Sequence, residues 1–257
     1  MPRQAVIIHT PEEIARIRRA AELTSLVRSQ VAAAVRPGMT TFDLDQLAGE
    51  FIAATGGKSA FLGYCGYPAN ICISVNDEVV HGIGSPQKVI GEHDIVSVDV
   101  GVAIDGGVGD CATTVCLGTP TPDIKRLLEG TERALDAGIA AARRGNHICD
   151  ISRAVQEVAH RYHLGVVREL VGHGCGVKMH EPPEVPNFVG WGKGPLLEPG
   201  MVICIEPMLN LGTAAVKTDH HDHWTVRTVD GKYSAHFENM VLITENEPEI
   251  LTWQKTM

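Results

Sequence analysis

The sequence contains no apolar segment long enough to cross a membrane. A transmembrane helix needs ~20 apolar residues, and no stretch of the 257-residue chain approaches that length. The N-terminal segment MPRQAVIIHTPEEIARIRRA also lacks the uninterrupted apolar core of a secretion signal. We therefore expect a cytoplasmic protein without a membrane partner.

Basic residues are in the minority. The chain has 22 Lys and Arg against 31 Asp and Glu, which gives a formal net charge of -9. Recognition of a nucleic acid backbone depends on clustered basic residues, so the charge balance argues against a specific nucleic acid partner. The 44% of hydrophobic residues suffices for an ordinary globular core.

The cysteines form no CxxC pair, and their number, seven, is odd. This pattern fits neither a disulfide framework nor a thiolate-based structural zinc site, and it favours a reducing compartment. We expect most of the cysteines to act as small core residues.

Four carboxylates stand in apolar, strand-like segments. Asp99 lies in IVSVDVGVAID, Asp110 in GVGDCATTVCLG, Glu206 in MVICIEP and Glu238 in HFENMVLIT. No Lys or Arg lies within several residues of the first three, and a buried carboxylate is costly unless a cation meets it. If the four converge, two divalent metal ions are the simplest cations. For each acid alone, the alternative is a strand-end residue that accepts backbone N–H groups.

The chain also repeats one pattern of helices and strands. Capping signals at residues 10–13 and 121–123 predict helices to about 35 and 144, and each is followed by a glycine turn and a second helix, over 41–55 and 148–162. Aligning Gly38 with Gly145 gives an offset of 107, which also aligns Asp99 with Glu206. We predict two related halves, about 10–118 and 121–245, with a site between them.

The hairpin between Asp99 and Asp110 provides a test of a shared site. If Asp105 and Gly106 form a two-residue turn, Asp99 faces Ala112, and Asp110 lies diagonally beside it on the same face. A three-residue loop without a bulge would send the two acids to opposite faces. Asp-Gly is the commoner hairpin signal, and it favours the shared site.

The segment VGHGCG adds a histidine, His173, bracketed by glycines that allow close backbone approach. One imidazole and four carboxylates make a hard ligand set that suits manganese, iron or cobalt at least as well as zinc. Two such ions activate water, so we expect metal-assisted hydrolysis. The alternative is a glycine-rich turn with a solvent-exposed histidine; a phosphate loop is weaker because no lysine follows in the required pattern.

Three further histidine-bearing segments have open interpretations. His81 and His180 stand beside Gly or Pro turns where a hydrolase could use them, although a hydrogen-bonded loop histidine is the alternative for each. The segment 219–223, DHHDH, is rich in possible ligands but lacks apolar periodicity. We interpret it as a solvated loop and assign it no role.

The ligand order Asp, Asp, His, Glu, Glu, in the contexts VDVGVAIDGGVGD, GHGCG, IEP and FEN, resembles the dinuclear-metal peptidases of the methionine aminopeptidase, prolidase and creatinase family. The segments LGYCGYPANICISVNDEVVHGIG, DHWTVRT and SAHFENMVLIT resemble the type I methionine aminopeptidases in particular. The resemblance covers about residues 10–245. It implies an α+β pita-bread fold, with a pseudo-twofold αα-ββ repeat around an antiparallel sheet, in one catalytic domain over 1–257.

The resemblance also assigns roles. It implies two divalent ions, Co, Mn, Fe, Zn or Ni, with Asp99 on one ion, Asp110 and Glu238 bridging both, and His173 and Glu206 completing the other. It further implies that a metal-bridging water or hydroxide attacks the first peptide carbonyl, and that Glu206 delivers the proton to the leaving amine. His180 and His81 would hydrogen-bond the substrate. The reaction would remove the N-terminal methionine of nascent polypeptides whose second residue is small.

The resemblance further implies a methionine pocket shaped by five side chains: Tyr64, Tyr67, Cys72, His81 and Trp224. The alternative is that Tyr64 and Trp224 are ordinary aromatic residues of surface loops. Three positions depart from common type I patterns and bear on the shape of the pocket: Cys65, Gly84 and Met179.

Rival interpretations remain within the same family. Prolidase, aminopeptidase P and creatinase relatives usually carry a large N-terminal domain, whereas the helical pattern here starts near residue 11. Type II enzymes carry a helical insertion that the second half lacks. A non-catalytic binding module should have lost ligands, yet all five are present. We expect a monomer that contacts the ribosome only transiently, if at all.

Overall fold

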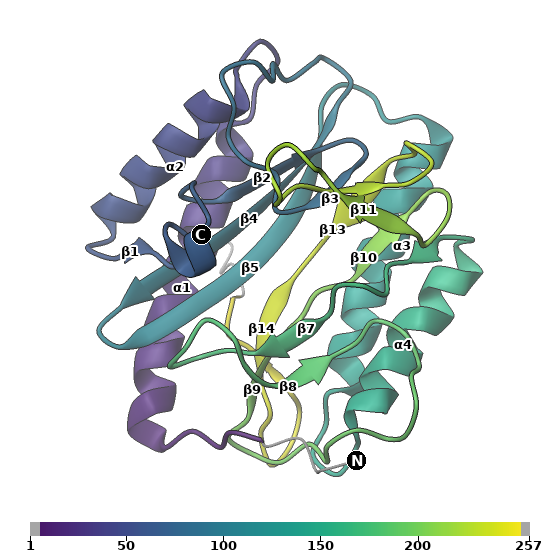
Figure 1. Ribbon diagram of the computed structural model, residues 1–257. Helices are drawn as coiled ribbons and strands as arrows, with labels where there is room; N and C mark the ends of the chain where they lie inside the picture. Colours follow the sequence, from purple (N-terminus) through teal and green to yellow (C-terminus); the bar gives the residue numbers. More distant parts are fainter. Residues whose placement is uncertain (1–5, 253–257) are drawn as a thin grey trace.

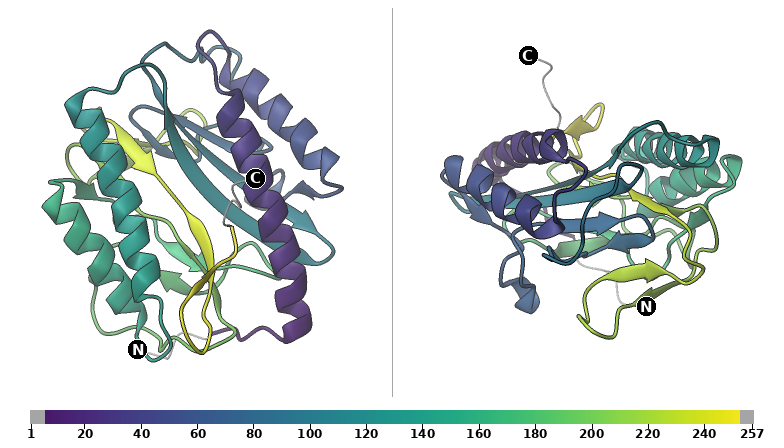
Figure 2. Two further views of the ribbon diagram at one scale, coloured as in Figure 1. Left: turned by 180° about the vertical axis from the view of Figure 1, so that it is seen from behind. Right: turned by 90° about the horizontal axis from the view of Figure 1, so that it is seen from above.

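The computed structural model describes residues 6–252, in which two pairs of helices lie on one face of a set of antiparallel strands (Figures 1 and 2). The first pair is α1 (Pro11–Ala34) and α2 (Thr41–Ala54), and the second is α3 (Pro122–Ala141) and α4 (Ile148–Arg161). Each pair therefore precedes the strands of its own half, as the repeat in the sequence predicts.

The helices begin where their capping residues stand. The Thr10 side chain accepts a hydrogen bond from the backbone N–H of Glu13, whose carboxylate accepts one from the backbone N–H of Thr10. Thr40 and Asp43 form the same reciprocal capping box at the start of α2. These bonds satisfy N–H groups that a helix N-terminus leaves free. The helix starts predicted from the sequence are confirmed.

Within residues 6–252 the strands are divided among four antiparallel sheets. In the first half, β4 (Ile95–Ile104) pairs with β5 (Gly107–Cys116), β2 (Cys72–Val75) and β1 (Lys58–Ser59). In the second half, β9 (Val202–Ile205) lies between β7 (Gly172–Gly174) and β14 (Asn239–Leu242), and β8 (Glu181–Val185) and β15 (Glu249–Ile250) complete that sheet. The two smaller sheets are formed by β13 (Ser234–His236), β10 (Met208–Asn210) and β6 (Gly165–Val166), and by β11 (Val216–Thr218), β12 (Val226–Thr228) and β3 (Glu78–Val80).

The hairpin of β4 and β5 has the predicted even loop. Asp105 and Gly106 both adopt positive φ, 51° and 77°, the backbone that a tight two-residue turn requires. In the resulting register Asp99 pairs with Ala112 and Asp110 with Gly101. Asp99 and Asp110 are therefore diagonal neighbours on one face of the sheet, and the prediction of a common face is confirmed.

Each helix pair buries its own hydrophobic cluster. Leu127 of α3 and Ile151 of α4 pack with Ile203 of β9, whereas Val27 of α1 packs with Val98 of β4. Full burial of one such side chain stabilises the fold by ~1.5–3 kcal/mol. The two clusters anchor the strands that carry the acids, so the positions of the acids depend on both halves.

None of the helices within residues 6–252 is long and apolar enough to span a membrane.

Helix α1 approaches the first sheet closely at Gly109 of β5. A Cβ atom at this position would lie 2.3 Å from Thr24 Oγ1 and 2.7 Å from the backbone of Ala20. Only glycine therefore allows α1 to lie directly on β5, the strand that presents Asp110.

We predict that Gly109→Ala lowers the free energy of unfolding by about 1–3 kcal/mol, the usual cost of overpacking a tight contact. Urea unfolding followed by circular dichroism measures the change. Gly190→Ala is the matched control, because its nearest atom would be 3.9 Å away, and it should change stability by less than ~0.5 kcal/mol. Equal effects of the two substitutions would contradict the packing argument.

Candidate metal centre

Five side chains with metal-ligating groups converge between the two halves, each from a different strand segment. Asp99 projects from β4 and Asp110 from β5, His173 from β7, Glu206 follows β9, and Glu238 precedes β14. They line one cavity of about 320 Å³. The structure thus brings together all five residues that the sequence proposed as ligands.

The five donors divide into two groups that share one residue. Oxygens of Asp99, Asp110 and Glu238 lie within 4.8 Å of one another, and so do donor atoms of His173, Glu206 and Glu238. His173 Nε2 lies 3.5 Å from Glu206 Oε1 and 3.6 Å from Asp110 Oδ2. Two adjacent groups of three donors can accommodate two neighbouring cations.

The acids fit a cation because the protein does not satisfy them. Asp110 and Glu238 are 3% and 2% exposed, and one oxygen each of Asp99, Asp110 and Glu238 is buried without a hydrogen-bond partner. Unpaired buried acceptors of this kind are rare in folded proteins. Their concentration at one point indicates a binding site for positive charge.

Burial changes the proton affinity of every acid in the group. It raises the pKa of Asp99 to about 6, and it raises the pKa values of Asp110, Glu206 and Glu238 well above their usual range. Desolvation disfavours the charged form, and neighbouring carboxylates add repulsion at Asp110, Glu206 and Glu238. A divalent cation would reverse both effects.

The histidines around the acids are held neutral. Burial lowers the pKa of His173 to about 3 and that of His81 to about 4, and it also lowers the pKa of His180. A neutral imidazole has the free lone pair that a metal ligand or a hydrogen-bond acceptor needs.

The glycines around His173 are explained by the backbones beside them. A Cβ at Gly172 would lie 2.4 Å from the carbonyl oxygen of Cys204, and one at Gly174 would lie 2.6 Å from that of Pro182. His173 Nδ1 lies 2.9 Å from the carbonyl oxygen of Gly174; because a carbonyl only accepts, Nδ1 carries the proton. This bond leaves the lone pair on Nε2, which faces the acids.

His81 and His180, the two histidines that the resemblance assigns to substrate binding, lie at the same cavity. His180 Nδ1 and the Tyr64 hydroxyl share a hydrogen bond of 2.9 Å, and the His180 ring lies 4.1 Å from that of His173. His81 follows β3 with a positive φ of 58° and lines the cavity edge-on to Trp224. Both side chains can reach a molecule bound beside the acids.

All the side chains expected to form a methionine pocket line this cavity. The Tyr67 hydroxyl donates to the carbonyl of Gly82 at 2.9 Å, and its ring packs edge-on against Trp224. The members of the predicted pocket that line the cavity are Tyr64, Tyr67, Cys72, His81 and Trp224. These side chains therefore form an apolar wall of the cavity that the acids also line.

The three unusual positions have different surroundings. Cys65 and Met179 line the cavity, so they affect its shape directly. Gly84 instead packs against α2, where a Cβ would lie 2.8 Å from Asp45 Cβ. Its effect on the cavity is therefore indirect.

The structure adds one histidine that the sequence pattern did not single out. His236 is 2% exposed, its Nε2 has no hydrogen-bond partner, and it lies 3.7 Å from Glu206 Oε2. The signal was present in the sequence, because residues two apart in an extended segment share a face, and Glu238 is two positions away.

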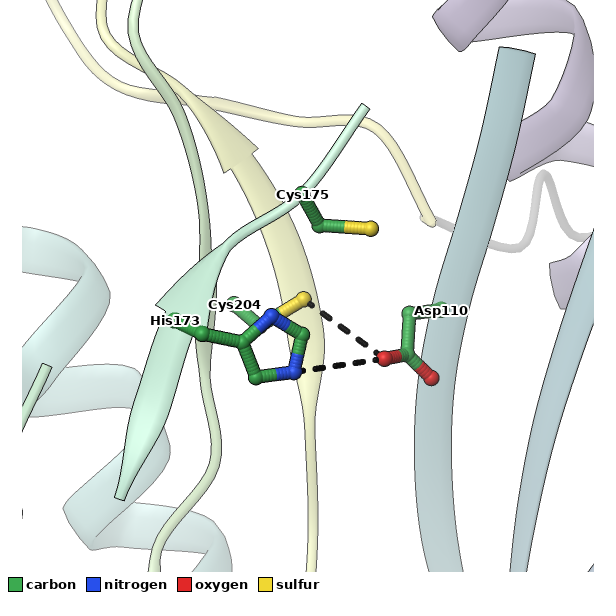
Figure 3. A group of neighbouring side chains, drawn as sticks. All are labelled: Asp110, His173, Cys175 and Cys204. Atoms are coloured by element: carbon green, nitrogen blue, oxygen red, sulfur yellow. Dashed lines mark hydrogen bonds and ion pairs between the residues drawn. The ribbon is translucent and has the colours of Figure 1, made fainter. Parts of the chain in front are cut away.

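Two buried thiols also border the site. The Cys204 thiol donates a long hydrogen bond, 4.0 Å, to Asp110 Oδ2, and Cys175 lies beside it (Figure 3). Burial raises the pKa of Cys204 well above its usual value. The sequence interpretation treated both cysteines only as core residues.

The DHHDH segment forms a separate, largely exposed loop. Donor atoms of Asp219, His220 and His221 lie close together, but Asp219 already accepts hydrogen bonds from the backbone N–H of His221 and from Arg227. This arrangement agrees with the solvated loop predicted from the sequence.

The sequence matches the family described as metallopeptidase family M24 over residues 15–245. A methionine aminopeptidase from Clostridium acetobutylicum is 45% identical, with 96% of this chain and 98% of the relative covered. Methionine aminopeptidase 1 of Bacillus subtilis is 43% identical, with 96% and 99% covered.

Solved structures of members of this family also match this chain. The crystal structure of a methionine aminopeptidase from Thermotoga maritima superimposes with a TM-score of 0.94 at 40% identity, and the match covers 97% of this chain and 100% of that one. A prolidase from Pyrococcus furiosus shares the fold, with a TM-score of 0.78 at 23% identity, and the match covers 97% of this chain and 66% of the prolidase.

The unsatisfied acids generate a prediction about stability. In a chelator at pH 7.5, Glu238→Gln should raise the free energy of unfolding by on the order of 1–3 kcal/mol, because a neutral amide avoids the burial of charge. A carboxyl group whose pKa is higher in the folded than in the unfolded protein lowers stability once the pH exceeds the unfolded pKa. The gain in stability from Glu238→Gln should therefore vanish as the pH falls to about 4. Urea titrations at both pH values measure it.

Glu181→Gln is the matched control, since Glu181 is also buried but accepts hydrogen bonds from the backbone N–H groups of Val177 and Lys178. That substitution should lower stability by about 1–3 kcal/mol. If Glu238→Gln also destabilised the metal-free protein, Glu238 would have a stabilising hydrogen-bond or ionic partner within the protein, and the prediction would be wrong.

Proposed function

The chain belongs to metallopeptidase family M24, and we propose that its five converging acid and imidazole side chains hold two divalent metal ions. The protein is a metal-dependent aminopeptidase that removes the N-terminal methionine of polypeptides, with the α+β pita-bread fold of the family. The observation that carries the proposal is the pair of three-donor groups that share Glu238 in one cavity.

The proposed ligands divide between the two ions. Asp99 would hold one ion, His173 and Glu206 would hold the other, and Asp110 and Glu238 would contribute to both. The bridging role of Asp110 is supported by its position, since it belongs to the group of Asp99 and also lies 3.6 Å from His173 Nε2. Four carboxylates then balance the charge of two divalent cations.

The donor set favours hard and intermediate metals. Oxygen-rich sites with one or two imidazoles suit manganese, iron, cobalt, nickel or zinc, and cellular availability selects among them. Bound ions of this kind supply Lewis acidity, which lowers the pKa of water and polarises a peptide carbonyl.

The residues of the chain supply proton transfer and substrate contacts. Glu206 lines the cavity in which a substrate would bind, so its carboxylate can accept a proton and pass it to the leaving amine. His180 and His81 hydrogen-bond the substrate carbonyl and amide. Tyr64 orients the His180 ring through the hydrogen bond that they share.

The apolar wall selects the first side chain. Tyr64, Tyr67, Cys72, His81 and Trp224 enclose a slot that suits the unbranched thioether of methionine. We propose that the second residue of the substrate must be small. The substrates are the N-termini of nascent polypeptides, and the protein acts in the cytoplasm as a monomer, with transient ribosome contact and no specific nucleic acid or membrane partner.

The proposed catalytic unit is the whole chain, 1–257, with related halves at about 10–118 and 121–245. The equivalence of the halves is supported by Gly38 and Gly145, which both turn the chain with positive φ, 85° and 87°. It is also supported by Asp99 and Glu206, which come from β4 and from the end of β9.

Peptide assays test this function directly. Protein loaded with Mn²⁺ or Co²⁺ should release methionine from Met-Ala-Ser, and it should leave Met-Lys-Ser and Ala-Pro peptides intact; chromatography of the products measures both. Glu238→Ala should abolish release, because it removes a proposed bridging ligand. Equal cleavage of Xaa-Pro peptides would indicate a prolidase-like specificity instead.

The role of Tyr64 gives a second test. Tyr64→Phe should lower kcat/KM for Met-Ala-Ser by about 2–10-fold, the loss expected from one hydrogen bond, while the unfolding curve stays unchanged. Tyr162→Phe is a control outside the cavity lining and should leave kcat/KM unaltered. A Tyr64→Phe enzyme with full activity would remove Tyr64 as a positioning residue for His180.

A further inference from the structure

The thiols of Cys175 and Cys204 lie beside two of the proposed catalytic ligands. Donor atoms of Asp110, His173, Cys175 and Cys204 lie within 4.8 Å of one another, and all four residues are buried or nearly so. Figure 3 shows the four side chains grouped around the space between β5 and the strands of the second half. This donor set differs chemically from the five oxygen and imidazole ligands.

We propose that these four side chains form a second, alternative metal site for thiophilic divalent cations such as Cd²⁺ and Zn²⁺, and that an ion there displaces the catalytic metals. Two thiolates, one imidazole and one carboxylate are donors that soft and borderline cations prefer, whereas manganese prefers the oxygens of Glu206 and Glu238. On binding, the two thiol protons leave for solvent and two metal–sulfur bonds form.

The observed spacing is near that of a tetrahedral site. Bonds of ~2.3 Å to sulfur and ~2.0–2.1 Å to nitrogen and oxygen place neighbouring donors ~3.3–3.8 Å apart. His173 Nε2 and Asp110 Oδ2 are already 3.6 Å apart, and Cys204 Sγ and Asp110 Oδ2 are 4.0 Å apart. Small side-chain shifts would therefore close the set around one ion.

Backbone hydrogen bonds hold both cysteines in the sheet that contains β7, β9 and β14. The N–H of Cys175 donates to the carbonyl of Val202 at 3.2 Å, which ties the residue after β7 to β9. Cys204 pairs with Met240 in the register of β9 and β14. Sites supported by strands in this way keep their geometry better than sites on loops.

The two metal sites cannot be filled together, because they share ligands. Asp110 and His173 belong to the thiol group and also to the proposed catalytic groups. An ion held by the thiols would withdraw both side chains from the catalytic ions. The site would thus make the enzyme sensitive to thiophilic metals. The inhibition rests on the proposed function, whereas the binding does not.

Titration of metal-free protein with Cd²⁺ tests the binding. The ultraviolet sulfur-to-cadmium charge-transfer band should grow and saturate at a single equivalent. Cys175→Ala and Cys204→Ala should each weaken the band and lower the Cd²⁺ affinity by at least about 10–100-fold, the loss typical of outer-shell partners alone. The double variant should lose the band.

Cys111→Ala is the matched control. Cys111 is fully buried and follows Asp110 in β5, but strand alternation directs its side chain to the other face. It should leave the band and the affinity unchanged. A band that persists in the folded double variant would overturn the proposal, because other thiols, such as exposed Cys65, would then bind the ion.

The sharing of ligands between the thiol site and the proposed catalytic site can be tested with wild-type protein alone. This test does not depend on whether the variants fold. Addition of Cd²⁺ to Mn²⁺-loaded protein should release Mn²⁺, detected by electron paramagnetic resonance of the free ion. Growth of the band without release would refute the shared ligands. Cysteine-dependent Cd²⁺ binding in a protein that cleaves no Met-Ala-Ser with any metal would refute the proposed function and leave the thiol site standing.

Discussion

The structure depends on the mutual repulsion of four carboxylates buried at one point. Asp99, Asp110 and Glu238 each leave one buried oxygen without a hydrogen-bond partner. Burial raises the pKa of these three acids and of Glu206. Protonation of the acids or a bound cation can offset that cost, and a bound cation does so with the carboxylates still charged. The fold therefore retains a local instability, and the same instability gives the site its affinity for metal.

The rest of the protein holds these four carboxylates in place. The large hydrophobic clusters under the two helix pairs anchor β4 and β9 separately, and glycines at close contacts let neighbouring backbones approach without intervening side chains. The ligands come from paired strands, whose hydrogen bonds fix the backbone before any metal binds. A preorganised site of this kind loses little conformational entropy on binding.

The same burial sets the chemistry of the surrounding residues. Neutral histidines remain available as ligands and hydrogen-bond partners because desolvation lowers their pKa values. The thiols of Cys175 and Cys204 extend the oxygen-rich site on one side. The oxygen donors that line the cavity are thus bordered by two soft donors, and hard and soft metals differ in which of these donors they prefer.

The sequence by itself determined the features that depend on local chemistry. Thr10 and Glu13 define a helix start, Asp105 and Gly106 fix the register of a hairpin, and that register puts Asp99 and Asp110 on one face. The order of the acids and the glycines beside His173 carried the family resemblance. The helix start and the hairpin register follow from rules that act within a few residues.

Only the tertiary structure decided which distant groups meet. His236 faces Glu206, and Cys175 and Cys204 lie close to Asp110. These contacts form because β7, β9 and β14 pair across long stretches of chain and β14 packs against β5. Such pairings are fixed by the packing of both halves, and no local periodicity encodes them. The sequence could therefore name the five proposed ligands, and its spacing from Glu238 could have pointed to His236, but nothing local pointed to the two thiols beside them.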